Sequence, residues 1–365
     1  MTVSAARGGV GILGIGTYLP PEIRRNDWWP AATVARWTAG QARGVALLRG
    51  APAETNPGAR DVARAMVDVE IDPFGGVIER RILAADQTST DMEAAAARVA
   101  LADAGVAAAD VDLLLVHTAV PEYLLSNTAC ILHHRLGLPT ACMALEAQAS
   151  AYSFLAQLAL ALPLIETGRA RHALLVQSCA VSRLMDPDDL FSARCGDAAT
   201  AVVIGPVGAG HGVLAMAHRV DGSRPRTLVA AAASGRWYDG PSRLAVPDPA
   251  GAQRVFLETV DQSREVIGGV LADAGLGADQ IDFFAVHQGT PWLRRLVQDH
   301  AGLTRAGAVD LFPRIGYVFA ASIPLVLAAA VSDRVLVDHA LVVMMGGGTG
   351  MTYGASALRW GRGRS

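Results

Sequence analysis

An internal repeat at an offset of 170 residues constrains the fold more than any other feature of this chain. In the first copy, Leu101-Ala-Asp-Ala-Gly105 leads through a short turn into an apolar run that ends in His117. In the second copy, Leu271-Ala-Asp-Ala-Gly275 leads in the same way into an apolar run that ends in His287. Each copy has the pattern of an amphipathic helix, a glycine that ends the helix, and a buried parallel strand.

Two further pairs of segments repeat in the same order. His172-Ala-Leu-Leu-Val176 matches His339-Ala-Leu-Val-Val343, and apolar, alanine-rich helices are expected to start near Ala149 and Ala320. The period is far too long for a solenoid of short repeats. The sequence therefore predicts an α/β protein built from a duplicated domain.

The glycine-rich turn at residues 205–212 is the expected division between the halves. We assign residues 1–205 to the N-terminal half and 206–365 to the C-terminal half. Residues from about 25 to 76 fit neither copy and are interpreted as an insertion, either a cap over a substrate entrance or a decorative loop.

Composition narrows the class of protein. The chain is 52% hydrophobic with a formal net charge of −3, which predicts a thick core and gives no reason to expect nucleic acid. Its longest apolar stretches, residues 151–165 and 317–331, are broken by serine and proline, so no membrane span is expected. The first residues have one arginine and a glycine-rich apolar run without a small-residue cleavage site, so no signal peptide is expected either. The spacing of the cysteines favours reduced thiols, no metal site and a cytoplasmic protein; they are Cys130, Cys142, Cys179 and Cys195.

Two common nucleotide motifs are rejected. Gly9-Val-Gly-Ile-Leu-Gly14 matches a dinucleotide-binding pattern but lies before or within the first expected strand, where it cannot join a strand to a helix. The sequence contains no lysine and therefore no Walker A site. No G-x-S-x-G motif of an α/β-hydrolase is present either.

Three segments in the second half carry a family resemblance. They are Ala285-Val-His-Gln-Gly-Thr290, Gly316-Tyr-Val-Phe-Ala-Ala-Ser-Ile-Pro324 and the glycine-rich turn Met345-Gly-Gly-Gly-Thr-Gly-Met-Thr-Tyr-Gly354. In this order and spacing the chain resembles β-ketoacyl-acyl-carrier-protein synthase III and its relatives in the thiolase superfamily. First-half segments fit the same resemblance, namely residues 14–20, 79–82, 126–130 and 195–199.

The resemblance implies a thiolase-like fold of five layers, αβαβα, and a homodimer or a heterodimer with a related synthase. It also implies an acyl thioester of coenzyme A or acyl carrier protein as substrate, and no cofactor. In the family, a cysteine nucleophile at a helix N-terminus works with a histidine and an asparagine. Two backbone N–H groups form the oxyanion hole.

The match to the family's catalytic positions is incomplete. His287 takes the position of the family histidine, with Gln288 after it, and Gly347 takes the position of the oxyanion glycine. Tyr317 stands where the family has asparagine. The chain is thus a divergent member that lacks the family cysteine and asparagine.

The position of the nucleophile is ambiguous. Alignment from the downstream side places Ala151 there, with its N–H in the oxyanion hole, whereas alignment from the upstream side places Ser150 there. Ser150 is then either a nucleophile that needs His287 as its base or a helix N-cap.

Further residues are assigned to the pocket and to docking by the same resemblance. Cys195 stands where the family commonly has a pocket phenylalanine, and Met345 opens the glycine-rich turn. Arg294 and Arg295 are candidates for contacts with the acidic carrier protein or the phosphates of coenzyme A, and Trp28 for the entrance.

The function expected from these residues is acyl transfer in specialised, polyketide-type metabolism. An acyl group would pass from its thioester to an O, N or C nucleophile, with His287 as general base and Ser150 or the acceptor itself as nucleophile. Two alternatives stay open. One is a catalytically silent subunit that pairs with an intact ketosynthase, and the other is altered thioester chemistry such as hydrolysis or cyclisation.

Overall fold

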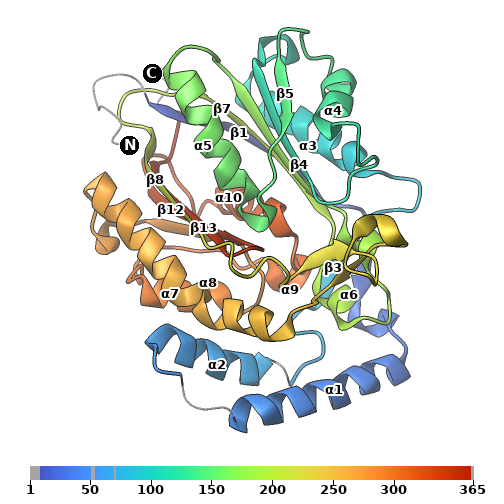
Figure 1. Cartoon of the computed structure of the whole chain (residues 1–365). Helices are drawn as coiled ribbons and strands as arrows, with labels where there is room; N and C mark the ends of the chain where they lie inside the picture. The colour runs from blue at the N-terminus through green and yellow to red at the C-terminus, as the bar shows by residue number, and fades with distance from the viewer. Residues whose placement is uncertain (1–8, 51–53, 70, 363–365) are drawn as a thin grey trace.

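Two β-sheets form the frame of the protein (Figure 1). The computed structural model describes residues 9–50, 54–69 and 71–362. The first sheet has the order β1 (Val10–Tyr18), β7 (Ala198–Pro206), β6 (Ala173–Cys179), β4 (Leu113–Thr118) and β5 (Met143–Glu146). The second has the order β11 (Phe283–Val286), β12 (Leu341–Gly348), β13 (Thr352–Arg359) and β8 (Gly212–Val220).

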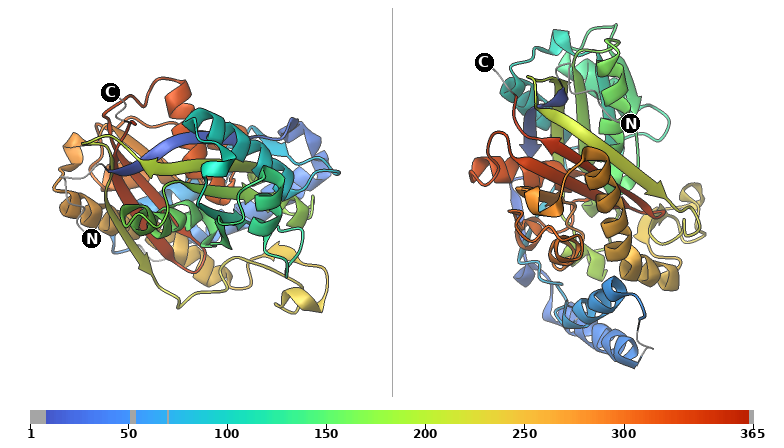
Figure 2. Two further views of the ribbon diagram at one scale, coloured as in Figure 1. Left: turned by 90° about the horizontal axis from the view of Figure 1, so that it is seen from above. Right: turned by 90° about the vertical axis from the view of Figure 1, so that its left-hand side faces the viewer.

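Helices complete a stack of five layers. The central layer contains α5 (Ser153–Glu166) and α10 (Ser322–Ser332), which share one core with both sheets. Helices α3 (Ser89–Ala104) and α4 (Thr128–Leu136) cover the outer face of the first sheet, and α7 (Pro249–Ala274) and α8 (Leu293–His300) cover that of the second (Figures 1 and 2). This confirms the αβαβα architecture predicted from the sequence.

The repeat has the local structure that its sequence predicts. Helix α3 ends at Gly105 with φ 64°, and α7 ends at Gly275 with φ 66°. A glycine is favoured at both positions because this left-handed backbone is strained for other residues. After a short 3-10 turn, each helix is followed by a buried strand, β4 or β11, that pairs in parallel with its neighbours.

An aspartate at the same position in each copy links the beginnings of two neighbouring strands by hydrogen bonds. Asp112, before β4, accepts hydrogen bonds from the backbone N–H groups of Arg171 and His172, before β6, at 2.7 and 3.2 Å. Asp282, before β11, accepts one from the N–H of Leu341 in β12 at 2.8 Å. These bonds fix the two parallel strands of each half side by side.

The glycines of β1 serve packing. A Cβ on Gly14 would lie 2.5 Å from the backbone nitrogen of Ala104, and a Cβ on Gly16 would lie 2.0 Å from the carbonyl oxygen of Ala96. Only glycine therefore allows α3 to lie this close to β1. The rejected dinucleotide pattern lies partly in this strand, as expected.

The segment that fits neither repeat forms helices instead of a decorative loop. It contains the 3-10 turn Asn26–Trp28, α1 (Ala31–Gly50) and α2 (Pro57–Val69), and α2 packs against α7. Trp29 and Trp37 pack with Phe74, and the indole of Trp29 donates to the carbonyl of Pro187 at 3.0 Å. The segment thus covers the outer helices of the second sheet (Figure 1).

Short elements complete the chain. Strand β2 (Glu22–Arg25) pairs with β3 (Glu79–Ile82), and β9 (Val229–Ala231) pairs with β10 (Arg243–Ala245). The remaining short helices are α6 (Leu190–Arg194) and α9 (Phe312–Ile315). All four cysteines are free. Within the described residues, no helix combines the length and the apolar character that crossing a bilayer requires.

Glu93 of α3 is a fully buried carboxyl group. Its Oε1 accepts hydrogen bonds from the hydroxyls of Thr118 and Ser178, both at 2.6 Å, and its Oε2 has no hydrogen-bond partner among the described residues. Burial raises the pKa of Glu93 to about 7 from its usual 4.5, because the charged form is poorly solvated there.

This shift predicts a pH-dependent contribution to stability. Between pH 4.5 and 7 the folded protein holds a proton that the unfolded chain releases, so this stabilisation is complete below pH 4.5 and is lost as the pH rises through 7. The free energy of unfolding of the wild type, minus that of Glu93→Gln, is expected to fall by about 3 kcal/mol over this window. Urea titrations of both proteins at several pH values measure the difference. Parallel pH curves for the two proteins would contradict the prediction.

Candidate functional site

Residues from three distant segments of the second half line one pocket of about 160 Å³. His287 follows β11, Tyr317 precedes the 3-10 turn Phe319–Ala321, and Gly347 lies at the end of β12. The carboxyl ends of parallel strands are a common place for ligand sites in α/β proteins. Much of the remaining wall is apolar and includes Leu228, Val246, Val255, Phe256, Trp292 and Leu293.

A turn of the first half lies against the glycine-rich turn. A Cβ on Gly348 would lie 2.6 Å from the carbonyl oxygen of Ala149, and a Cβ on Gly354 would lie 2.1 Å from the ring of Tyr152. Both positions therefore require glycine for the 3-10 turn Ser150–Tyr152 to pack here. This contact brings Ser150 to the glycine-rich turn, with its own Cβ 3.3 Å from the Cβ position built on Gly348.

Ser150 has an unusual backbone conformation, with φ 52°. Phe319, which opens the corresponding turn before α10, has φ 47°. Such angles in residues other than glycine cost about 1–3 kcal/mol and often occur at functional sites. Ser150 is half-buried whereas Ala151 is fully buried, so the strained and more accessible position belongs to Ser150.

The N-cap alternative for Ser150 is wrong. The Ser150 side chain makes no capping hydrogen bond. Instead, the hydroxyl of Ser153 ties the turn together, because it accepts from the N–H of Ala149 at 2.8 Å and donates to the carbonyl of Ser150 at 2.6 Å.

One hydrogen bond determines what His287 offers to the pocket. The backbone N–H of Gly347 donates to Nδ1 of His287 at 3.2 Å, which favours the neutral tautomer with its proton on Nε2. Burial lowers the pKa of His287 to about 4, which keeps the ring neutral at neutral pH. His287 therefore presents a donor, and the expected general-base role does not fit this tautomer. The N–H of Gly347 is likewise engaged by the ring and is not free for an oxyanion.

Tyr317 adds a second donor beside His287. Its backbone N–H donates to the carbonyl of Arg194 at 2.8 Å, and its own carbonyl accepts from Gly196 at 3.1 Å. The phenol ring stacks on Phe319 with centroids 4.2 Å apart and lies 6.3 Å from the ring of His287. Burial raises the pKa of Tyr317, so the hydroxyl keeps its proton.

Gln288 positions the chain instead of lining the pocket. Its side-chain N–H donates to the carbonyl of Val309 at 2.6 Å, and its oxygen accepts from the N–H groups of Leu311 and Phe312 at 2.7 and 3.0 Å. These bonds hold the segment that leads to Tyr317. The expected contact of Gln288 with substrate is therefore replaced by a supporting role.

No cysteine is suited to be a nucleophile. Cys195 lines a separate cavity of about 30 Å³, and burial raises the pKa of its thiol to about 12. Burial also raises the pKa of Cys142, to about 11, and that of Cys179. A thiol with a raised pKa holds little of the reactive thiolate. Cys130 is exposed on α4, on the outer face of the first sheet.

Two other predicted residues serve the fold. Met345 is fully buried in the core between β12 and α7, and its sulfur lies 3.6 Å from the hydroxyl of Ser263, so its predicted place in the pocket is wrong. Arg294 binds both carboxylate oxygens of Asp310, at 2.6 and 2.7 Å. Its guanidinium, expected to contact the carrier protein or coenzyme A, is therefore already paired within the chain.

The remaining docking candidates are accessible. Arg295 is exposed on α8. Trp28 is 47% exposed, with the guanidinium of Arg24 3.9 Å from the centre of its ring. Neither residue lines the pocket that contains His287.

Comparison with known proteins agrees with this architecture. The family model for 3-oxoacyl-[acyl-carrier-protein (ACP)] synthase III matches residues 145–222, and that for its C-terminal part matches residues 271–360. The β-ketoacyl-[acyl-carrier-protein] synthase III of Geobacillus kaustophilus is 35% identical over 357 residues, which cover 97% of this chain and 100% of the relative.

Solved structures agree as well. The 3-oxoacyl-(acyl carrier protein) synthase III of Pseudomonas aeruginosa PAO1 has a TM-score of 0.77 and 29% identity, covering 96% of this chain and 98% of the other. The priming β-ketosynthase of the R1128 polyketide biosynthetic pathway has a TM-score of 0.79, with 98% of each chain covered. At 23% identity, this second likeness shows the fold alone.

The tautomer and pKa of His287 are open to direct measurement. In ¹⁵N-histidine-labelled protein, the signal absent from His287→Gln is expected to show a proton on Nε2 and to titrate near pH 4, because the ring is buried and Nδ1 accepts from Gly347. The exposed ring of His134 serves as the internal reference. A proton on Nδ1, or titration near pH 6.5, would contradict the geometry described above.

Proposed function

The chain belongs to the β-ketoacyl-[acyl-carrier-protein] synthase III family, and from that premise we propose that it is an acyltransferase of specialised, polyketide-type metabolism. The acyl group passes from a thioester of coenzyme A or acyl carrier protein to an O, N or C nucleophile. The protein is a thiolase-fold enzyme of ketosynthase III type. The proposed reaction needs no resident cofactor.

The observation that carries the proposal is a pair of neutral donors in one apolar pocket. Both residues line the same pocket with their rings 6.3 Å apart, and in the proposed reaction the Nε2–H of His287 and the hydroxyl of Tyr317 donate to the same substrate carbonyl oxygen. As the acceptor attacks the carbonyl carbon, that oxygen gains negative charge, and each donor contributes about 2.7–4 kcal/mol to its stabilisation. The C–S bond then breaks, and the proton of the acceptor ends on the departing thiol.

The proposal favours direct transfer over an acyl-enzyme. A serine hydroxyl is a weak nucleophile at neutral pH unless a base takes its proton. Nε2 of His287 already carries a proton, and the thiols have raised pKa values or lie outside the pocket. Ser150 therefore shapes the strained turn, and the acceptor attacks the thioester itself.

The lining supports an acyl chain as the substrate. Leu228, Val246, Phe256 and Leu293 line the pocket beside the two donors. A concave apolar pocket with a few polar groups is typical of a small-molecule site. On the surface, exposed Arg295 remains our candidate contact for the phosphates of coenzyme A or an acidic carrier protein.

Intact-mass measurement combined with thiol release tests this route. With a panel of acyl-coenzyme A donors and alcohol, amine and carbon acceptors, we expect thiol release without a covalent adduct. His287→Ala is expected to lose about 10²–10³-fold in rate, and Tyr317→Phe to lose rate as well, because each removes an oxyanion donor. Ser150→Ala is expected to keep most of the activity.

Other outcomes separate the alternatives. An adduct that is absent in Ser150→Ala but present in the control Cys195→Ala would establish a serine acyl-enzyme and overturn direct transfer. Neither adduct nor release with any donor and acceptor would indicate the silent subunit. In that case, activity is expected only after addition of a related synthase that contains the full set of catalytic residues.

The first sheet offers a surface for a second copy of the chain. Among the described strands, β5 lies at the edge of its sheet and pairs with β4 alone, and its Met143 and Leu145 are 46% and 45% exposed. Beside it, the N–H of Thr128 donates to Glu146 at 2.7 Å, and the segment just before Thr128 contains Leu125, which is 98% exposed. Uncovered apolar edges of this kind invite pairing with another chain. We propose a homodimer in which two β5 edges meet around a twofold axis.

Light scattering after gel filtration measures this association. The wild type is expected to have the mass of a dimer, and Leu145→Arg that of a monomer, because it places like charges at the paired edges. Val99→Asp, at an exposed position on α3, is the matched control and is expected to stay dimeric. A monomeric wild type, or a dimeric Leu145→Arg, would contradict the proposed edge.

A further inference from the structure

Three potential metal ligands meet at the end of the second sheet remote from the pocket. His211 directly precedes β8, and Asp338 and His339 lie just before β12. Their ligand atoms all lie within 4.8 Å of one another. Nε2 of His211 lies 3.7 Å from Oδ1 of Asp338, and Nε2 of His339 lies 3.4 Å from Oδ2 of the same carboxylate.

His211 is the member of this group that calls for a ligand. It is only 6% exposed, and neither of its ring nitrogens has a hydrogen-bond partner among the described residues. The 3.7 Å to Asp338 is beyond hydrogen-bond range. A buried polar group left without a partner costs about 1–3 kcal/mol, so such groups are rare without a ligand or water. The rings of His211 and His339 lie side by side, with centroids 4.5 Å apart.

We propose that His211, Asp338 and His339 bind a divalent transition-metal ion, and that Zn²⁺ fits best. Zinc bonds to imidazole nitrogen and carboxylate oxygen are about 2.0–2.2 Å long in a tetrahedral arrangement, which places neighbouring ligand atoms about 3.3–3.5 Å apart. Asp338 lies 3.4 Å from His339 through Oδ2 and 3.7 Å from His211 through Oδ1, both close to this spacing. Since all three ligand atoms already lie within 4.8 Å of one another, a rearrangement of the exposed Asp338 carboxylate would bring them around one ion. Two imidazoles also favour zinc over calcium or magnesium, which take oxygen ligands.

The backbone holds this arrangement in place. His339 has φ 65°, a strained angle, and its N–H donates to the carbonyl of Trp360 at 2.9 Å. Gly361 lies beside Asp338 with φ 116°, a backbone angle that favours glycine.

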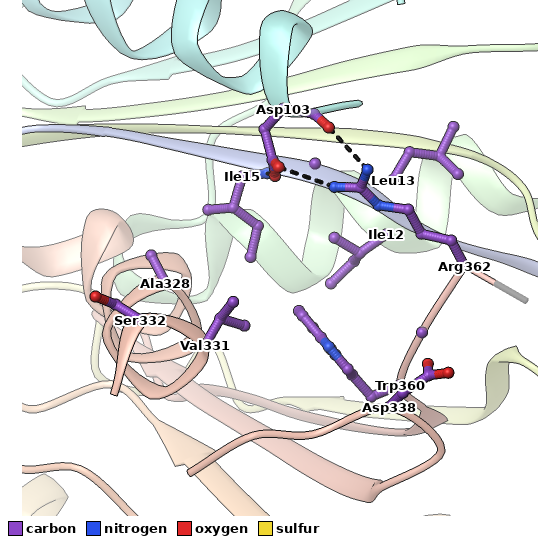
Figure 3. Close-up of a pocket in the computed structure, with 12 residues that line it drawn as sticks. Ile12, Leu13, Ile15, Asp103, Ala328, Val331, Ser332, Asp338, Trp360 and Arg362 are labelled. Carbon is purple, nitrogen blue, oxygen red and sulfur yellow. Dashed lines mark hydrogen bonds and ion pairs between the residues drawn. The ribbon is translucent and has the colours of Figure 1, made fainter. Parts of the chain in front are cut away.

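The arginines near the group have other partners. Arg359 donates to the carbonyl of His339 at 3.2 Å, and Arg362 binds Asp103 at 3.0 Å. Asp338 lies beside Trp360 at one side of a cavity of about 640 Å³, with Asp103 on the other side (Figure 3). The carboxylate of Asp338 therefore stays available to a cation, and the cavity leaves room for a water at the fourth coordination position.

The site would act as a clip between strands. It joins the starts of β8 and β12, next to the end of β13, where Gly361 follows. Gly347 lies at the other end of β12, about 20–25 Å away at the rise of an extended strand. The bound ion is thus expected to stabilise the second sheet without contact with the reacting groups.

Metal titration of the untagged, chelator-treated full chain tests the site. Calorimetry with Zn²⁺ is expected to show one ion per chain, and Co²⁺ is expected to give the visible absorption of a tetrahedral nitrogen and oxygen site. Asp338→Asn and His339→Ala, both at exposed positions, are each expected to weaken Zn²⁺ binding about tenfold or more. Zn²⁺ is expected to raise the melting temperature of the wild type and not of these variants.

A second histidine–carboxylate pair provides the matched control. His300 lies 3.0 Å from Asp61, with no third ligand among the residues that the structure describes, so His300→Ala is expected to bind Zn²⁺ like the wild type. Unchanged affinity in both Asp338→Asn and His339→Ala, or no binding at micromolar Zn²⁺, would overturn the proposal. These two variants decide the question even if His211→Ala fails to fold. No acyl transfer enters the readout, so the result is independent of the proposed reaction.

Discussion

The burial of α5 and α10 between the two sheets is the constraint from which the candidate site follows. Both helices belong to one core with the inner faces of the sheets, so the chain must enter each helix through a tight turn instead of a solvated loop. Each entry is a 3-10 turn whose first residue has a positive φ, Ser150 in one half and Phe319 in the other. The turn before α5 packs against the glycine-rich end of β12, and Tyr317 precedes the turn before α10. The pocket lies where these segments meet β11.

The bond from Gly347 to His287 then limits the chemistry. One N–H group cannot both hold the imidazole and bind an oxyanion, so its use by the ring transfers the donor role to Nε2–H. With a pKa of about 4, only about one ring in a thousand is charged at pH 7, which leaves a neutral donor. The phenol of Tyr317, also neutral, is larger than the family's asparagine but supplies the same kind of group. Histidine and tyrosine thus form a donor pair in a site where no thiolate is available.

The sequence predicted what depends on local pattern. The repeat gave the helix, glycine and strand order of both halves, and the five layers followed from the resemblance. His287, Tyr317 and Gly347, which the sequence predicts as site residues, line one pocket, but the sequence does not predict their bonding, because a tautomer depends on which backbone group reaches Nδ1. Gln288, Met345 and Arg294 were assigned to substrate, but their partners, such as Val309 for Gln288, come from segments that no local pattern pairs with them. The sequence does not predict the metal site, because His211 lies more than a hundred residues before Asp338 and His339 and the three ligands form no motif of short spacing.

Strand β12 connects these two results. Its start lies beside the histidines of the proposed clip, and its end carries the glycines that fit against Ser150–Tyr152 and hold His287. Glycine runs weaken a strand because they lose more conformational entropy on folding and offer no side chain to pack. The site nevertheless needs Gly347 within hydrogen-bond distance of Nδ1, and a displacement of an ångström there would break that bond. A metal ion at the start of β12 would restrain the strand where its residues have side chains that pack in the core. The glycines at its other end would then stay free to fit against the turn Ser150–Tyr152. The proposed metal site, which would stabilise the sheet, and the pocket with the proposed reacting groups thus lie at opposite ends of β12.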